Sequence, residues 1–277
     1  MTIITLLFLL AGASRAEEPI KVATLNVNWG ISTASNTVKT IHIAKPDIIL
    51  IQEPSPQMES GLKNALSKKY PHSHFKGPDH GYNYYADRFG ILSKHPFDAR
   101  FLPHTKDGAF GALIALVRWG KKNIQVVNVH LDPPRLLDTD HPLRSLKDFA
   151  DREKTRSAEI KTIYAALTPD IPTVIAGDFN SLAGSPTINL MTNFGFIDTH
   201  TFQTNRPPKN TWQGDVSGIP LSLRIDYVFC DKSFEPIRAQ VIGCKSSDHS
   251  LVLSELRLKT QDRQSPRDNS LKAAPKE

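Results

Sequence analysis

Short apolar segments that end in polar residues recur along this chain, and they restrict what it can fold into. The clearest is Thr173–Ser181, in which an apolar run ends at Gly177 and is followed by Asp178 and Asn180. A short apolar run that ends at glycine is typical of a buried strand. Asp178 and Asn180 are two positions apart, so their side chains project from the same side of extended backbone. The segment predicts a strand that delivers a carboxylate and an amide together, unless the two residues only cap a turn.

Other predicted strands end in the same way. Ile20–Val27 carries Asn26, Asp47–Glu53 ends in a carboxylate before Pro54, and Ile124–Leu131 ends near His130. Each residue alone has an ordinary explanation, such as a loop hydrogen bond, a salt bridge or a core histidine. Packed sheets place ligand sites at strand ends, so the joint pattern predicts one site. The residues that share the pattern are Asn26, Glu53, His130, Asp178 with Asn180, Asp226, and Asp248 with His249.

The remaining segments predict helices and loops between these strands. A serine before a proline, at Ser185 and Pro186, is typical of a helix N-terminus, and Gly195 is expected to end that helix. Other helices are expected at Val38–Ala44, Pro56–Tyr70 and Arg144–Leu167, and a hairpin turn at Gly120–Asn123. Surface loops are expected at His72–Tyr85, Leu131–Arg144 and Thr204–Ile219, where substrate specificity would reside.

The N-terminus indicates export. Residues 3–11 are apolar, and Ser14-Arg15-Ala16 places small residues at the positions that a signal peptidase reads, although a basic n-region is missing. We therefore expect a cleaved signal at residues 1–16, a catalytic domain at 17–258 and a disordered polar tail at 259–277. An amphipathic or buried N-terminal helix is the alternative. The mature chain shows no membrane-spanning run, and we expect a secreted or periplasmic monomer.

The charge of the chain is compatible with a polyanionic partner but does not require one. The formal net charge of the 277 residues is +6. Arg15 contributes one positive charge and residues 259–277 contribute two, so the predicted domain carries only +3.

The two cysteines leave two alternatives open. Cys230 and Cys244 lie on two predicted strands that flank a short turn region and are expected to be neighbours. In an exported protein they could form a disulfide, or both could be buried free thiols. Their spacing does not suit a structural zinc site.

The polar strand ends resemble, in order, the signature motifs of the endonuclease/exonuclease/phosphatase superfamily. The resemblance extends from Lys21 to Leu258. That superfamily includes pancreatic-type deoxyribonucleases, exonuclease III-like repair enzymes, neutral sphingomyelinases and inositol polyphosphate 5-phosphatases. The resemblance implies an α/β fold, a four-layered α/β/β/α sandwich of two packed mixed sheets. The matching motifs are Asn26, Ile51-Gln52-Glu53, Asn128-Val129-His130, Gly177-Asp178-Phe179-Asn180, Arg224-Ile225-Asp226-Tyr227 and Ser247-Asp248-His249.

The resemblance also implies roles for these residues. Glu53 would be the principal Mg²⁺ ligand, with Asn26 and Asp248 close by, and Mn²⁺ or Ca²⁺ as alternatives. Asp226 would hold His249, which would act as the base or polarise the phosphate. Asp178 would orient water or assist the leaving group, and Asn180 and His130 would contact the phosphate. The stretch with Tyr85, Asp87 and Arg88 resembles a deoxyribonuclease segment in which the tyrosine touches phosphate and an acid supports the histidine that corresponds to His130.

This inventory suits phosphodiester hydrolysis. Mg²⁺ needs few carboxylates because it prefers oxygen ligands and keeps several waters, and it neutralises charge on phosphoryl oxygens. Histidines paired with a carboxylate handle protons near neutral pH. We expect an exported metal-dependent phosphodiesterase that acts on nucleic acid. A lipid or inositol head-group phosphoesterase is the main alternative, although no apolar hairpin for membrane entry is evident. A non-catalytic binding module is a third.

Overall fold

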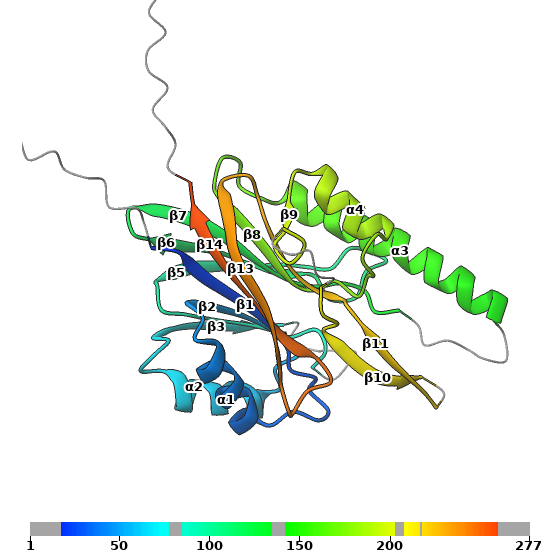
Figure 1. The fold of residues 1–277 in the computed structure, drawn as a ribbon, viewed down its shortest axis with the longest axis horizontal. Helices are drawn as coiled ribbons and strands as arrows, with labels where there is room; N and C mark the ends of the chain where they lie inside the picture. Colours follow the sequence, from blue (N-terminus) through cyan, green and yellow to red (C-terminus); the bar gives the residue numbers. More distant parts are fainter. Residues whose placement is uncertain (1–17, 78–84, 135–141, 203–207, 217, 260–277) are drawn as a thin grey trace, which may run out of the picture.

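The protein folds into four layers, with two packed sheets inside and helices outside (Figure 1). The structure is a computed structural model that describes residues 18–77, 85–134, 142–202, 208–216 and 218–259. The predicted signal and nearly all of the predicted tail lie outside the described residues. The four-layered fold class is the one that the resemblance implied.

The first sheet has six strands in the order β13-β14-β1-β2-β4-β3. It is mixed, because β1 pairs parallel to β2 and antiparallel to β14. Its strands are β1 (Ile20–Asn26), β2 (Ile48–Gln52), β3 (His72–Lys76), β4 (Phe89–Ser93), β13 (Phe234–Gly243) and β14 (Ser250–Leu258).

The second sheet also has six strands, in the order β5-β6-β7-β8-β12-β9. It too is mixed, because β7 pairs parallel to β8 and antiparallel to β6. Its strands are β5 (Phe97–Leu102), β6 (Ala112–Trp119), β7 (Lys122–His130), β8 (Thr173–Asp178), β9 (Ile197–Asp198) and β12 (Asp226–Cys230). A separate two-stranded hairpin, β10 (Trp212–Val216) and β11 (Ile219–Leu223), extends away from both sheets (Figure 1).

Side chains that alternate along each strand point to opposite faces of the sheet and pack into different hydrophobic cores. In β1, Val22 packs between the two sheets, whereas Ala23 and Leu25 pack with the helices outside. Helices α1 (Ala34–Ala44) and α2 (Pro56–Leu66) cover the first sheet, and α3 (Pro142–Ala165) and α4 (Pro186–Asn193) cover the second. No helix in the described part of the chain has the length and apolar character that a membrane span requires.

Strand pairing brings the polar strand ends to one edge of the sandwich. In the second sheet, His130 of β7 and Asp226 of β12 both lie opposite Asp178 of β8. Gly177 precedes Asp178 with φ 153°, and a Cβ there would lie 1.9 Å from the carbonyl oxygen of Val129. A glycine at this position is therefore what allows β7 and β8 to approach beside the site.

Several sequence predictions need correction. The predicted loop His72–Tyr85 begins with strand β3, and β5 was not predicted. The predicted loop Thr204–Ile219 contains all of β10 and the first residue of β11, and its residues 204–207 and 217 lie outside the described residues. Ser185 does begin α4, since its hydroxyl accepts the backbone N–H of Ile188.

The two cysteines are buried free thiols. Cys230 packs between the sheets, whereas Cys244 belongs to the core beneath α1 and α2. The strands that were predicted to be neighbours, β12 and β13, belong to different sheets. The disulfide alternative is therefore wrong for this structure.

Candidate active site

One buried amide joins the two sheets at this edge. The Nδ2 group of Asn26 donates to Oε1 of Glu53 at 2.8 Å and to Oδ2 of Asp178 at 3.1 Å. Glu53 follows β2 of the first sheet, whereas Asp178 ends β8 of the second. The side chain of Asn26 thus fixes two carboxylates relative to each other, although 152 residues separate it from Asp178.

His249 lies between two carboxylates. Its Nδ1 is 2.9 Å from Oδ2 of Asp226, and its Nε2 is 3.8 Å from Oδ2 of Asp178. Burial alone would lower the pKa of His249, but the negative charges of Asp226, Asp178 and Asp248 outweigh burial and raise the pKa to about 10. His249 is therefore an imidazolium at neutral pH, with Nδ1–H donated to Asp226.

Asp178 is a carboxyl group of this site whose pKa lies near neutrality. Burial and the adjacent Asp226 raise the pKa of Asp178 to about 7, although the positive charge of His249 opposes them. Asp178 can therefore exchange a proton at physiological pH, which is the property that a general base needs.

His130 is held as a neutral imidazole beside the same carboxylates. Its Nδ1 lies 2.9 Å from the carbonyl oxygen of Ala86, which can only accept, so Nδ1 carries the hydrogen. Burial lowers the pKa of His130 to about 3, and its ring stacks on Phe110 at 4.1 Å. Its Nε2 faces Glu53 at 3.8 Å and Asp178 at 3.7 Å.

The site fits a divalent cation. Burial raises the pKa of Glu53, and the basic side chains within 4.0 Å of Glu53 and Asp178 among the described residues are histidines rather than lysines or arginines, with His130 neutral. Carboxylate oxygens of Asp178 and Asp226 also lie within 4.8 Å of each other, beside the imidazolium of His249. Carboxylate oxygens suit Mg²⁺, which would offset the cost of burying this negative charge.

Backbone strain is concentrated at the same edge. Asn28, Glu53 and Asn180 have φ angles of 51°, 62° and 49°. Left-handed backbone is costly for a side chain such as glutamate, and it persists where surrounding contacts enforce it, commonly at functional sites.

Not every predicted site residue points into this cluster. The Asn180 amide donates to the carbonyl of Leu131, and Arg88 pairs with Glu59 of α2 at 2.7 Å. Asp87 is buried nearby, but the contact at Nδ1 of His130 is with Ala86 rather than with Asp87. Tyr85 lies next to Trp29, with the two rings edge to face at 6.2 Å.

Two residues were missed by sequence reasoning. Asn28 donates from Nδ2 to Oδ1 of Asp248 at 2.8 Å, and Trp212 donates from Nε1 to Oδ2 of Asp248 at 2.8 Å. The only sequence signal was the position of Asn28 two residues after Asn26, at the end of a predicted strand.

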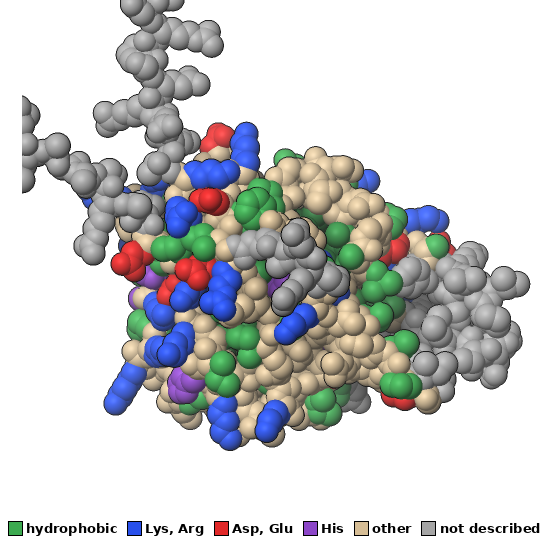
Figure 2. Space-filling model, viewed as in Figure 1, with side chains coloured by type: hydrophobic (Ala, Val, Ile, Leu, Met, Phe, Trp, Pro, Cys, Tyr) green, Lys and Arg blue, Asp and Glu red, His purple; other side chains and the backbone are tan. Residues whose placement is uncertain are grey.

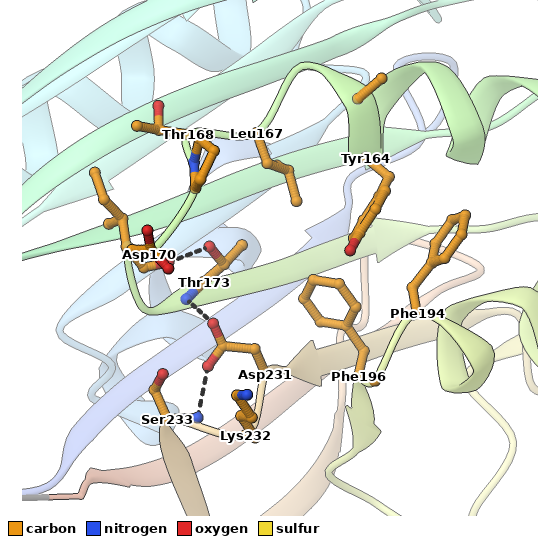
Figure 3. Close-up of a pocket in the computed structure, with 14 residues that line it drawn as sticks. Tyr164, Leu167, Thr168, Asp170, Thr173, Phe194, Phe196, Asp231, Lys232 and Ser233 are labelled. Atoms are coloured by element: carbon orange, nitrogen blue, oxygen red, sulfur yellow. Dashed lines mark hydrogen bonds between the residues drawn. The ribbon is translucent and has the colours of Figure 1, made fainter. Parts of the chain in front are cut away.

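A pocket of about 720 Å³ lies elsewhere, between the C-terminal ends of α3 and α4 (Figure 3). Tyr164, Phe194 and Phe196 form its aromatic wall, and Thr173 lies at its polar side. Thr173 begins β8 and Asp178 ends it, so this pocket and the catalytic edge lie at opposite ends of one strand.

The surface charge is mixed on the face that Figure 2 shows. Lysine and arginine side chains lie over the left part of this face with aspartate and glutamate among them. This distribution agrees with the modest net charge of the predicted domain.

Comparison with known proteins identifies the fold and a matching family. The model of the Endonuclease/Exonuclease/phosphatase family matches residues 23–249. No curated protein matches the sequence significantly.

Several solved structures are similar. An endonuclease/exonuclease/phosphatase family protein from Leptotrichia buccalis C-1013-b has a TM-score of 0.66 and 17% identity, covering 86% of this chain and 100% of that one. A functionally unknown conserved protein from Enterococcus faecalis V583 has a TM-score of 0.66 and 19% identity, with 87% and 100% covered. D. rerio TDP2, complexed with single strand DNA product, has a TM-score of 0.64 and 16% identity, with 86% and 99% covered.

Proposed function

The chain belongs to the Endonuclease/Exonuclease/phosphatase family, and from this membership we propose that it is an exported, divalent-metal-dependent phosphodiesterase that hydrolyses nucleic acid. The observation that carries the proposal is the His249 imidazolium, which Asp226 holds next to the titratable carboxyl group of Asp178. A fixed cation beside a base is the pair of groups that attack of water on a phosphodiester requires.

Different residues of the chain have different roles in this hydrolysis. His249 donates Nε2–H to a phosphoryl oxygen, and Asp226 keeps the imidazolium oriented and protonated. Asp178 in its ionised form accepts a proton from the attacking water. Asn26 fixes the positions of Asp178 and Glu53 relative to each other, and His130 contributes a neutral ring that stacks on Phe110 and faces both carboxylates.

Mg²⁺ is the cation that we propose, with Mn²⁺ or Ca²⁺ as alternatives, and Glu53 as its principal ligand. When bound, the cation supplies neutralisation of the charge on the phosphoryl oxygens. Asp178 and Asp226, whose carboxylate oxygens lie within 4.8 Å of each other, would offer further oxygen ligands.

Two features support nucleic acid as the substrate. Trp29 is 38% exposed and lies edge to face with Tyr85, and its backbone nitrogen is 3.4 Å from Oε2 of Glu53. A partly exposed indole on a residue whose backbone contacts Glu53 can stack on a base next to the scissile phosphate. In addition, a structure of similar fold, D. rerio TDP2, is complexed with single strand DNA product.

Export and a monomeric state are also part of the proposal. The apolar residues 3–11 and the small residues around Arg15 support a cleaved signal. N-terminal sequencing of protein recovered outside the cell tests the cleavage site, and light scattering tests the oligomeric state.

A substrate panel tests the function. Purified protein is incubated with plasmid DNA, RNA, sphingomyelin, an inositol phosphate and a generic phosphodiester, each with and without EDTA. We expect cleavage of a nucleic acid that EDTA abolishes. Hydrolysis of sphingomyelin or the inositol phosphate, with both nucleic acids left intact, would favour the head-group alternative. A protein that binds but hydrolyses none of them would be a binding module.

Replacing Trp29 with alanine is expected to raise KM for an oligonucleotide about tenfold, because stacking on an aromatic ring contributes about 1–3 kcal/mol per base. Hydrolysis of a small phosphodiester without a nucleobase should be unchanged. Trp29→Phe retains a ring and is the matched control, so it should lose much less. Equal loss on both substrates in Trp29→Ala would instead indicate damage to Glu53.

A further inference from the structure

Asp248 connects three segments of the chain at the edge of the active site. Its Oδ1 accepts Nδ2–H of Asn28 and its Oδ2 accepts Nε1–H of Trp212, both at 2.8 Å. Its carbonyl oxygen accepts the backbone N–H of Gln213 at 2.9 Å. We call these contacts with Asn28, Trp212 and Gln213 the Asp248 bridge.

The indole of Trp212 in this bridge packs against the backbone of its own strand. Trp212 begins β10 and forms an isolated β-bridge with His249, the residue after Asp248. A Cβ atom at Gly214 would lie 2.2 Å from Cζ2 of Trp212, so the indole packs directly over the Gly214 backbone. Glycine at position 214 is thus the residue that lets the indole reach Asp248.

The other end of the bridge leads to the metal-binding side of the site. Asn28 has left-handed backbone, and its N–H donates to Oδ1 of Asn26 at 2.9 Å. The amide of Asn26 in turn donates to Glu53 and Asp178. A continuous series of hydrogen bonds therefore extends from the hairpin, through Asp248, to both carboxylates.

Both oxygens of Asp248 face neutral N–H groups. Each of these contacts occupies one lone pair of an Asp248 oxygen and turns the carboxylate towards Asn28 and the hairpin. Asp248 is covalently adjacent to His249, so a change in its position alters the imidazolium directly.

We propose that Trp212 is a positioning residue for the reaction, and that Asp248 aligns His249 and Asn26 through this bridge instead of binding the metal. The role in the reaction rests on the proposed phosphodiesterase function. The role of Asp248 as a hydrogen-bond acceptor rather than a metal ligand does not.

Kinetics of Trp212→Phe test the positioning role. Phenylalanine retains the ring but removes Nε1–H, which leaves Oδ2 of Asp248 without this donor. We expect kcat to fall about tenfold, as the loss of one hydrogen bond to a charged group implies, while KM changes less than about twofold. A wild-type kcat in Trp212→Phe would overturn the proposal.

Gly214→Ala tests the packing of the Trp212 indole over Gly214 without removing any functional group. Its methyl group should displace the indole and reproduce the loss of kcat seen in Trp212→Phe. In a Trp212→Ala background the same Gly214→Ala change should cost nothing further, because the indole is already absent. Gly243→Ala is the matched control, since a Cβ at Gly243 would meet nothing within 4 Å. Additive losses of kcat in the double variant would contradict the claim that Gly214 acts through the position of the Trp212 indole.

Two measurements that need no activity separate this inference from the proposed function. In wild-type protein the indole N–H resonance of Trp212, assigned through Trp212→Phe, should lie downfield and move upfield in Asp248→Asn. Mn²⁺ affinity, measured by calorimetry, should change less than about threefold in Asp248→Asn and in Trp212→Phe. A tenfold or larger loss of Mn²⁺ affinity in Asp248→Asn would identify Asp248 as a ligand and overturn the proposal, whether or not the protein hydrolyses nucleic acid.

Discussion

Replacing Asp178 with alanine is expected to lower kcat for nucleic acid hydrolysis by about 10²–10³-fold or more, the usual cost of losing a preorganised catalytic group. Three of the interactions described above end at this carboxylate. It accepts the amide of Asn26, and it faces the Nε2 atoms of both His130 and His249. Its removal therefore eliminates the base and also leaves the two histidines without their shared neighbour. We expect comparable losses in His249→Ala.

The pH dependence of kcat/KM should follow the ionisation of Asp178 and of His249. Because the pKa of Asp178 is raised to about 7, the ionised base is lost as the pH falls through 7, and the rate should fall with it. Because the pKa of His249 is raised to about 10, its proton is lost as the pH rises through 10, and the rate should fall again. The residual activity of Asp178→Ala should lack the acidic limb.

Asp98 provides a control for Asp178. It is exposed on strand β5, and Asp98→Ala should leave kcat unchanged. Near-wild-type rates in both Asp178→Ala and His249→Ala would refute the assignment of the active site.

Removal of divalent cations is expected to abolish hydrolysis, with a loss of at least about 10²–10³-fold that added Mg²⁺ reverses. Glu53 is the residue through which this effect should operate. Its side chain is only 14% exposed, its pKa is raised by burial, and Asn26 and the backbone of Trp29 already orient it. Glu53→Gln retains the shape of the side chain but removes its charge, so it should need far more Mg²⁺ for any activity.

Thermal unfolding distinguishes a loss of Mg²⁺ binding from a defect in the hydrolysis step. A cation that binds only the folded protein stabilises it by about 2.7 kcal/mol at a concentration 100 times its Kd. Mg²⁺ should therefore raise the Tm of the wild-type protein and of Trp29→Phe, and should fail to raise that of Glu53→Gln at the same concentration. Full activity of the wild-type protein in EDTA would exclude a metal-dependent mechanism.

The strands of the core could be predicted because they are short, apolar and continuous. β8 and β2 are bounded by glycine or proline and buried on both faces, so their sequences have few alternatives. β3 was missed because His72–Lys76 is polar and only partly buried, which is typical of a sheet edge as well as of a loop. The β10–β11 hairpin was missed for a similar reason, since it pairs with neither sheet.

The site was partly predictable for the same reason. Polar residues that end buried strands, such as Glu53 and Asp178, stand out against an apolar background. Asn28 and Trp212 do not, because their significance comes from contacts with Asp248 that span 220 and 36 residues. Such contacts depend on how loops from different sheets meet, which local periodicity does not record.

The amide of Asn26 has a consequence for how the protein regains activity after denaturation. Since this one side chain must reach a carboxylate from each sheet, neither half of the sandwich can assemble the site before the halves have docked. Catalytic competence should thus return only with the last step of refolding, later than the recovery of helical and strand signal in circular dichroism.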